Sequence, residues 1–253
     1  MSLVATDVIV LHVQDYLESS RIVRLATREL GVQSALARGS RRPKSRFGHS
    51  LDLFASGVAQ FTVRPGRDLS NLTGFDLTRS RMAIAADLDR FAAASAIAEL
   101  ALRFSFADPN DGAFDVLTDS FDAIAGASAG SATDAGLAAA WQYITSLGFG
   151  PSIDSCCTCQ SALAAGDQAS FSHEAGGVLC ARCAVGVVAG RSLPASARDA
   201  IRTWLDGRPA ALAGEAERRA HLRLLREFLQ HHLTDGREML ARDGWEASQR
   251  RTA

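Results

Sequence analysis

The residues whose type and spacing point most directly to chemistry are four cysteines. They form two C-x-x-C pairs, Cys156 with Cys159 and Cys180 with Cys183, and twenty residues separate the pairs. Each pair lets two thiolates approach one ion from a tight turn, and two pairs close a tetrahedral four-sulfur site without an open position. Catalysis at a metal needs such an open position, so the spacing predicts one structural zinc ion. Cys157 is left over as a spare thiol.

Other readings of the cysteines stay open at the level of the sequence. Independent buried thiols would not explain the paired spacing. A redox dithiol would explain one C-x-x-C pair but not the second, and no thioredoxin-like βαβ pattern surrounds either pair. An iron–sulfur cluster also takes four thiolates. Closure by a metal would contribute on the order of 10 kcal/mol to the folding of residues 154–185.

A second candidate functional segment is a cationic stretch in the first third of the chain. Its five cations fall within nine residues: Arg38, Arg41, Arg42, Lys44 and Arg46. Glycine and proline within the stretch oppose a helix, so these charges are expected on a loop. Phe47 and His49 place flat rings beside them.

Cations interleaved with aromatic rings are what a single nucleic-acid strand needs, because its phosphates are neutralised while its bases stack. We therefore predict a DNA-binding loop that includes Phe47, with Arg21 and Arg24 of a neighbouring predicted strand completing the set. The alternative is a solvated loop whose charges only aid solubility.

The element that must present this loop is predicted to be a small β-barrel. Five short strands are expected over residues 7–13, 21–27, 32–37, 55–63 and 68–76, with no long helix among them. Alternation along the second strand puts Val23 and Leu25 on one face and Arg24 on the other. Five short strands in about 75 residues are typical of a closed barrel, and the OB-fold is the natural candidate.

Beyond residue 78 the pattern becomes helical. Helices are predicted over residues 81–103, 114–125, 137–147, 194–204 and 215–233, with a loop over residues 126–136. The predicted fold class is α+β, with an N-terminal OB-fold β-barrel followed by an all-helical domain that carries a four-cysteine zinc finger. The domain ranges are 1–78 for the DNA-binding barrel, 79–153 with 186–253 for the helical domain, and 154–185 for the zinc-finger insertion.

Composition excludes several classes of protein. The 253 residues are 47% hydrophobic and carry a net charge of −1, which excludes a wholly disordered chain and a uniformly basic coat. No apolar run approaches the roughly 18–20 residues of a membrane span. The first residues lack a basic region typical of a secretory signal, and clustered cysteines do not look like a secreted disulfide framework. We expect a soluble cytosolic protein.

Several segments together resemble the bacterial RecO family of recombination-mediator proteins along nearly the whole chain. The segments that carry the resemblance are residues 8–11, 16–23, 27–31, 37–45, 108–110, 114–115 and 147–154, Phe171, and Gly176-Gly177 before Cys180. The sequence departs from the family at Gln160, where a glycine usually follows the first cysteine pair. It also departs in the alanine- and glycine-rich residues 126–136.

The resemblance implies an OB-fold, a helical domain and a zinc finger inserted between helices. It implies binding to single- and double-stranded DNA, annealing of complementary strands, and help for the recombinase on strands coated by single-strand-binding protein. The implied partners are the acidic C-terminal tail of that protein, RecR and sometimes RecF, with no membrane. The implied location is the cytoplasm, in association with the nucleoid.

Three rival functions are also consistent with parts of the sequence. An enzyme is disfavoured, because the six histidines form no recognisable catalytic or metal motif and phosphate-loop glycine patterns are absent. A zinc-ribbon module that binds only proteins would be separated from the DNA-binding interpretation by a gel-shift experiment at moderate salt. A generic RNA-binding OB protein would be distinguished by competition between DNA and RNA.

Overall fold

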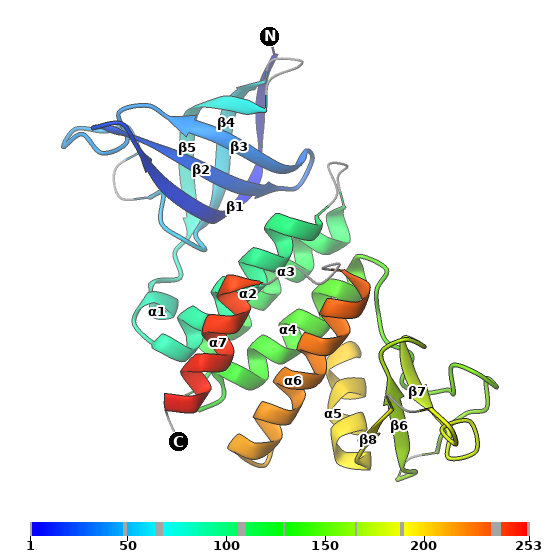
Figure 1. Cartoon of the computed structure of the whole chain (residues 1–253). Coiled ribbons are helices and arrows are strands. Elements are labelled where there is room, and N and C mark those ends of the chain that lie inside the picture. The colour runs from blue at the N-terminus through cyan, green and yellow to red at the C-terminus, as the bar shows by residue number, and fades with distance from the viewer. Residues whose placement is uncertain are drawn as a thin grey trace. The chain divides into compact units, whose positions relative to one another are not determined.

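A computed structural model of the chain describes residues 2–47, 50–63, 68–105, 110–128, 130–164, 166–187, 190–233 and 239–251. The chain forms two compact units, residues 1–126 and residues 127–253 (Figure 1). The domain boundaries predicted at residues 78, 153 and 185 differ from the boundary between these two units, and the predicted domain ranges stay a prediction.

The first unit begins with a closed five-stranded barrel. Its strands are β1 (Ser2–Tyr16), β2 (Ser20–Thr27), β3 (Gly31–Ala37), β4 (Ser56–Val63) and β5 (Leu69–Arg79). The barrel order is β1-β2-β3-β5-β4, in which β1 also pairs with β4 and the β3–β5 pair is parallel. The long strand β1 pairs with β4 through residues 2–9 and with β2 through residues 8–16, and its register against β2 shifts between Val10 and His12. A bulge of this kind bends the strand and increases its twist, which helps the barrel to close. The predicted N-terminal OB-fold is confirmed.

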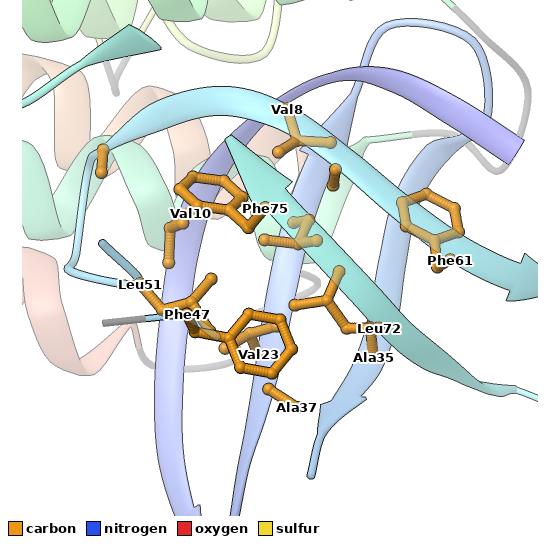
Figure 2. Close-up of a cluster of buried hydrophobic side chains, with 13 residues drawn as sticks. Val8, Val10, Val23, Ala35, Ala37, Phe47, Leu51, Phe61, Leu72 and Phe75 are labelled. Carbon is orange, nitrogen blue, oxygen red and sulfur yellow. The ribbon is translucent and has the colours of Figure 1, made fainter. Parts of the chain in front are cut away.

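The alternation predicted for β2 also holds, since Val23 and Leu25 point into the barrel. The small residues Ala35 and Ala37 of β3 share this core with the large rings of Phe47, Phe61 and Phe75 (Figure 2). The full core comprises Val8, Val10, Val23, Leu25, Ala35, Ala37, Phe47, Leu51, Ala55, Ala59, Phe61, Leu72 and Phe75. The barrel interior is therefore a packed core rather than a ligand cavity.

After the barrel, the part of the first unit that the structure describes forms three helices: α1 (Met82–Ala85), α2 (Leu88–Phe104) and α3 (Asp111–Gly126). The single helix predicted from residue 81 is wrong, because Asp87 interrupts it. The Asp87 carboxylate accepts a hydrogen bond from the Arg90 backbone N–H and caps the start of α2. Because α1 ends at its C-cap residue Ala86, the two helices are separate elements that meet at Asp87.

A buried arginine ties the barrel to α3. Arg81 is only 5% exposed, and it donates hydrogen bonds to the Phe54 carbonyl, the Ser56 hydroxyl and the Asp122 carboxylate at 2.6–2.8 Å. Burial lowers the pKa of Arg81 to about 10, so the guanidinium stays charged at neutral pH. Asp122 also receives an ion pair from Arg79. The charge of Arg81 is thus satisfied on several sides.

The described residues of the second unit form four helices: α4 (Ala132–Ser146), α5 (Ala195–Leu205), α6 (Glu215–His232) and α7 (Leu240–Arg251). The loop predicted over residues 126–136 is too long by several residues, because α4 already begins at Ala132. Ala132 and Gly136 are buried there, and burial in the packed unit overrides their weak helical pattern. Trp141 of α4 packs edge-on against Phe228 of α6, with ring centroids 5.2 Å apart.

A small antiparallel sheet lies between α4 and α5 in the chain. It consists of β6 (Ala169–Ser172), β7 (Gly177–Leu179) and β8 (Arg191–Leu193), in the order β7-β6-β8. At Gly177 the backbone passes so close to Ser152 that a Cβ would lie 2.2 Å from its carbonyl oxygen. Only glycine fits there. This close approach lets the segment before the first cysteine pair form a bridge with β7.

Candidate nucleic-acid interface and metal centre

The cationic loop is a chain of tight turns fastened to the hairpin between β1 and β2. The Arg42 N–H donates to the Gly39 carbonyl at 3.1 Å, and Gly39 adopts a left-handed φ of 68° that suits glycine. The Arg41 N–H donates to the Ser19 carbonyl at 3.0 Å. The Gly39 N–H donates to the Ser20 hydroxyl at 3.2 Å. The backbone of the loop is therefore held against the hairpin while its side chains extend outward.

All five cations of the loop are exposed. Arg41 pairs with Asp15 of β1 at 3.2 Å. Within the described residues the other four have no carboxylate within 4.0 Å; they are Arg38, Arg42, Lys44 and Arg46. Exposed cations without a counter-charge raise the local positive potential, which attracts a polyanion. The loop thus has the electrostatic character expected from its sequence.

The two strand arginines of the predicted site differ from each other. Arg21 lies 3.4 Å from Asp15, the same carboxylate that pairs with Arg41, and it therefore borders the loop. Arg24 instead donates to the Leu102 carbonyl at 3.4 Å, near the C-terminal end of α2. A cation there is favoured by the helix dipole. The structure brings Arg21 together with the loop and gives Arg24 a partner elsewhere.

The expectation that Phe47 stacks on a base is wrong in this structure. Its side chain is 2% exposed and lies within the barrel core, beside Leu51 and Val23 (Figure 2). The ring is large and apolar, and burying it stabilises the barrel more than exposing it would. Arg46 sits over the ring with its guanidinium carbon 5.1 Å from the centroid. His49 lies outside the described residues.

A groove of about 450 Å³ runs beside the loop, and it holds an aromatic residue that the reasoning from sequence did not select. Tyr16 at the end of β1 lines this groove together with Leu17, Arg38 and Arg42. The tyrosine is 41% exposed. The sequence did contain a signal for Tyr16. It is an aromatic residue at the end of a strand, and one hairpin turn separates it from Arg21, which belongs to the predicted site.

The four predicted metal ligands come together in the second unit. One sulfur atom from each of Cys156, Cys159, Cys180 and Cys183 lies within 4.8 Å of the others, and Cys157 is not part of the cluster. The sulfur atoms of Cys159 and Cys180 are 3.8 Å apart. A tetrahedral site with zinc–sulfur bonds of about 2.3 Å has sulfur atoms about 3.8 Å apart. The cluster therefore fits a metal ion.

The chemistry of the thiols also calls for a cation. Hydrogen bonds from Ser161 lower the pKa of Cys159 to about 5. Hydrogen bonding to Cys159 raises the pKa of Cys183 to about 12. A thiolate thus forms readily at Cys159, whereas Cys183 resists losing its proton. Four thiolates can be held this close only when a cation neutralises them, so the residues fit a tetrathiolate metal centre.

Local structure explains how the first cysteine pair is shaped. Residues 154–163 form a small hairpin, in which the Cys156 N–H donates to the Ser161 carbonyl at 2.9 Å. The turn of this hairpin needs a left-handed residue, and Gln160 adopts it with a φ of 59°. Glycine takes this conformation without strain. The departure from the resembled family at Gln160 therefore leaves the turn intact at a cost in strain.

Charged contacts attach this cysteine module to the helices of its own unit. Arg202 of α5 donates to Asp154 at 2.5 Å. Glu227 of α6 accepts from Arg191 at 2.5 Å and contacts the Nε2 atom of His173 at 3.1 Å. Burial acts to raise the pKa of Glu227, but the hydrogen bonds and charges of Arg191 and His173 outweigh it and lower that pKa. The centre is thus fixed to a rigid support.

Comparisons with known proteins cover both units. The family described as "Recombination protein O N terminal" matches residues 1–81, and "Recombination protein O C terminal" matches residues 85–239. A DNA repair protein RecO from Anaeromyxobacter sp. (strain K) is 37% identical over 241 residues, 92% of each chain. Those from Pelotomaculum thermopropionicum and Myxococcus xanthus are each 30% identical over at least 90% of both chains.

Among the described residues, no helix is both long and apolar enough to span a membrane.

Proposed function

Because this chain belongs to the RecO family of DNA repair proteins, we propose that it binds single- and double-stranded DNA and anneals complementary strands. It also assists the loading of recombinase on strands coated by single-strand-binding protein. No covalent bond is made or broken in this activity, so the protein acts as a mediator and not as an enzyme. It acts in the cytoplasm, in association with the nucleoid.

The observation that carries the proposal is the set of exposed, uncompensated cations on a loop of the barrel. Arg38, Arg42, Lys44 and Arg46 contact phosphates, and Arg41 joins them while sharing its charge with Asp15. Contacts to phosphates hold a strand without reading its sequence. That property suits annealing, because both strands must be held in any sequence and their bases must stay free to pair. Arg21 supports the edge of the site, and Arg24 is the more remote contributor.

We further propose that the four clustered cysteines hold one zinc ion. Its role is structural, because four protein sulfurs leave no position for water or substrate. When bound, the ion supplies charge neutralisation that keeps the two cysteine pairs together. Cys156, Cys159, Cys180 and Cys183 are the ligands, and Cys157 stays outside the site.

The proposed protein partners follow from the family. They are the acidic C-terminal tail of single-strand-binding protein, the RecR ring and, in some settings, RecF. An acidic tail is attracted by positive surface, and this chain has such surface on the loop although its overall charge is −1.

An annealing assay tests the proposal. Complementary labelled strands, bare or coated with single-strand-binding protein, are mixed with the wild-type chain, with the triple variant Arg38→Ala, Arg42→Ala, Arg46→Ala, and with a control. The control, Arg208→Ala, Arg219→Ala, Arg223→Ala, removes the same charge from exposed arginines of the second unit.

We expect the wild-type chain and the control to accelerate annealing and the loop variant to lose most of that acceleration. Equal loss in both variants would mean that total charge matters and the loop does not. Absence of annealing by the wild-type chain on bare and on coated strands would refute the proposed activity. Preference for RNA in a competition experiment would favour the RNA-binding alternative.

A further inference from the structure

The groove between the β1–β2 hairpin and the cationic loop combines apolar surface with positive charge. Tyr16 is 41% exposed and the adjacent Leu17 is 76% exposed, and both line the groove together with Arg38 and Arg42. We propose that Tyr16 and Leu17 form a platform on which unpaired bases of a single DNA strand rest while the two arginines bind its phosphates. This inference rests on the proposed function and deepens it, because it names the form of DNA that the site prefers.

The first argument is that neither side chain serves the fold in an evident way. The core of the barrel is filled by other residues, and Tyr16 and Leu17 are not among them. Within the described residues the Tyr16 hydroxyl has no hydrogen-bond partner. Buried tyrosines usually find one, and a tyrosine that keeps a wet hydroxyl and an open ring is typical of a binding surface. Tyr16 thus has a ring face and a hydroxyl available to a ligand.

The second argument is the backbone of Leu17. It adopts a left-handed φ of 52°, which bulky side chains rarely take. The conformation closes the short turn between Tyr16 and Ser20, which pair across the hairpin. A glycine or asparagine would close the same turn without strain. Leu17 therefore occupies a strained and exposed position, where it extends the apolar surface of Tyr16.

The third argument is charge. Arg38 and Arg42 lie on the same groove and have no carboxylate partner in the described part of the chain. The neighbouring Asp15 is already paired with Arg41 at 3.2 Å and with Arg21 at 3.4 Å. Glu18, exposed at the hairpin tip, is the local charge that opposes a phosphate. Stacking surface beside unpaired arginines matches a single strand, which offers alternating base faces and phosphates.

The platform distinguishes single strands from duplex. In a duplex both faces of each base are covered by neighbouring base pairs, so only the phosphates remain for the protein. In a single strand the faces are free to stack on Tyr16. The protein therefore holds unpaired strands more tightly than the paired product. Pairing removes the base contacts and favours release of the product, which gives annealing a direction.

The test measures the binding of a fluorescently labelled oligothymidine and of a duplex of equal length, each over a range of salt concentrations. Tyr16→Ala is expected to weaken single-strand binding about five- to tenfold, the lower part of the range for a base stacked on an aromatic ring, because under half of the residue is exposed. Duplex binding and the slope of log affinity against log salt stay unchanged. Tyr16→Phe keeps the ring and retains most of the affinity.

A second variant separates binding from stability. Leu17→Gly removes the apolar side chain and also relieves the left-handed strain, so its melting temperature should not fall. Weaker single-strand binding by this stable variant supports the platform. Unchanged binding overturns the claim that Leu17 contacts the bases. Leu77→Ala removes an exposed apolar side chain from β5 and serves as a control that keeps wild-type affinity.

Direct contact is tested by photo-crosslinking of an oligonucleotide that contains 5-iodouracil, with the modified peptide identified by mass spectrometry. Crosslinks at residues 16–17 are expected. If the wild-type chain binds single strands with a steep salt dependence and Tyr16→Ala matches it on both substrates, the platform is refuted while DNA binding stands. If the wild-type chain binds neither substrate, the proposed function itself fails.

Discussion

Removing the uncompensated arginines of the loop should change how DNA binding responds to salt. Each phosphate that a protein neutralises releases counterions, so the logarithm of affinity falls with the logarithm of salt concentration. The slope is about −0.7 for each neutralised phosphate on a single strand. The triple variant at Arg38, Arg42 and Arg46 removes three exposed cations, and none of the three has a carboxylate partner in the described part of the chain.

The expected change in slope follows from the number of arginines removed. If each arginine contacts its own phosphate, the slope becomes shallower by at most about 2.1. Over a fourfold rise from about 50 to 200 mM salt, this difference corresponds to roughly a twentyfold change in affinity. The wild-type chain should lose about twenty times more affinity over that range than the variant. Arg41→Ala alone should have a smaller effect than Arg42→Ala, because Asp15 already neutralises Arg41.

Fluorescence anisotropy with a labelled single strand, at four or more salt concentrations, gives the slope. The control triple variant at Arg208, Arg219 and Arg223 removes equal charge from the second unit and should keep the wild-type slope. A loop variant with weaker affinity but an unchanged slope would show that these arginines support the fold and contact no phosphate. Equal flattening in both variants would place phosphate contacts on both units and refute the assignment of the site to the loop.

Three further predictions concern stability. Chelation of the metal, or Cys180→Ser, should remove hydrogen-exchange protection from residues 154–185 while the barrel keeps its protection, because a tetrathiolate site contributes on the order of 10 kcal/mol to local folding. Gln160→Gly should stabilise the chain by about 0.5–1 kcal/mol in urea unfolding, because relief of a left-handed residue outweighs the added freedom of the unfolded chain. Arg81→Ala should destabilise by about 3 kcal/mol, whereas Arg79→Ala, which loses an exposed pair to the same carboxylate, should cost less than about 1 kcal/mol.

Each of these has a result that would contradict it. Metal analysis that finds no zinc in protein purified without chelator would remove the metal centre. A lower stability for Gln160→Gly would mean that its side chain contributes more than its backbone costs. Equal effects of the Arg81 and Arg79 variants would show that burial does not govern this cluster.

Much of the architecture could be predicted because its signals are local. The barrel strands alternate inward and outward side chains, the cysteine spacing brings four sulfurs together, and the resemblance to the RecO family is confirmed by matches to both units. The helix α7 is not predicted by the sequence pattern, because its twelve residues are mostly polar, although Trp245 is buried. The break at Asp87 was missed because its cap depends on one carboxylate within a continuous helical pattern.

The candidate site was harder to predict, because aromatic rings beside cations have two uses that the sequence does not separate. Phe47 and Tyr16 both flank arginines, yet Phe47 is buried in the barrel and Tyr16 lies open on the groove. The burial of Phe47 follows from its position directly after the loop. A large ring there anchors the returning chain in the core, and removing such a ring typically costs about 3–5 kcal/mol. The Arg41 N–H bond to Ser19 holds the loop partway along. Phe47 therefore contributes to the proposed DNA-binding site by fixing where the cations lie, and the proposed stacking surface is the hairpin that faces them.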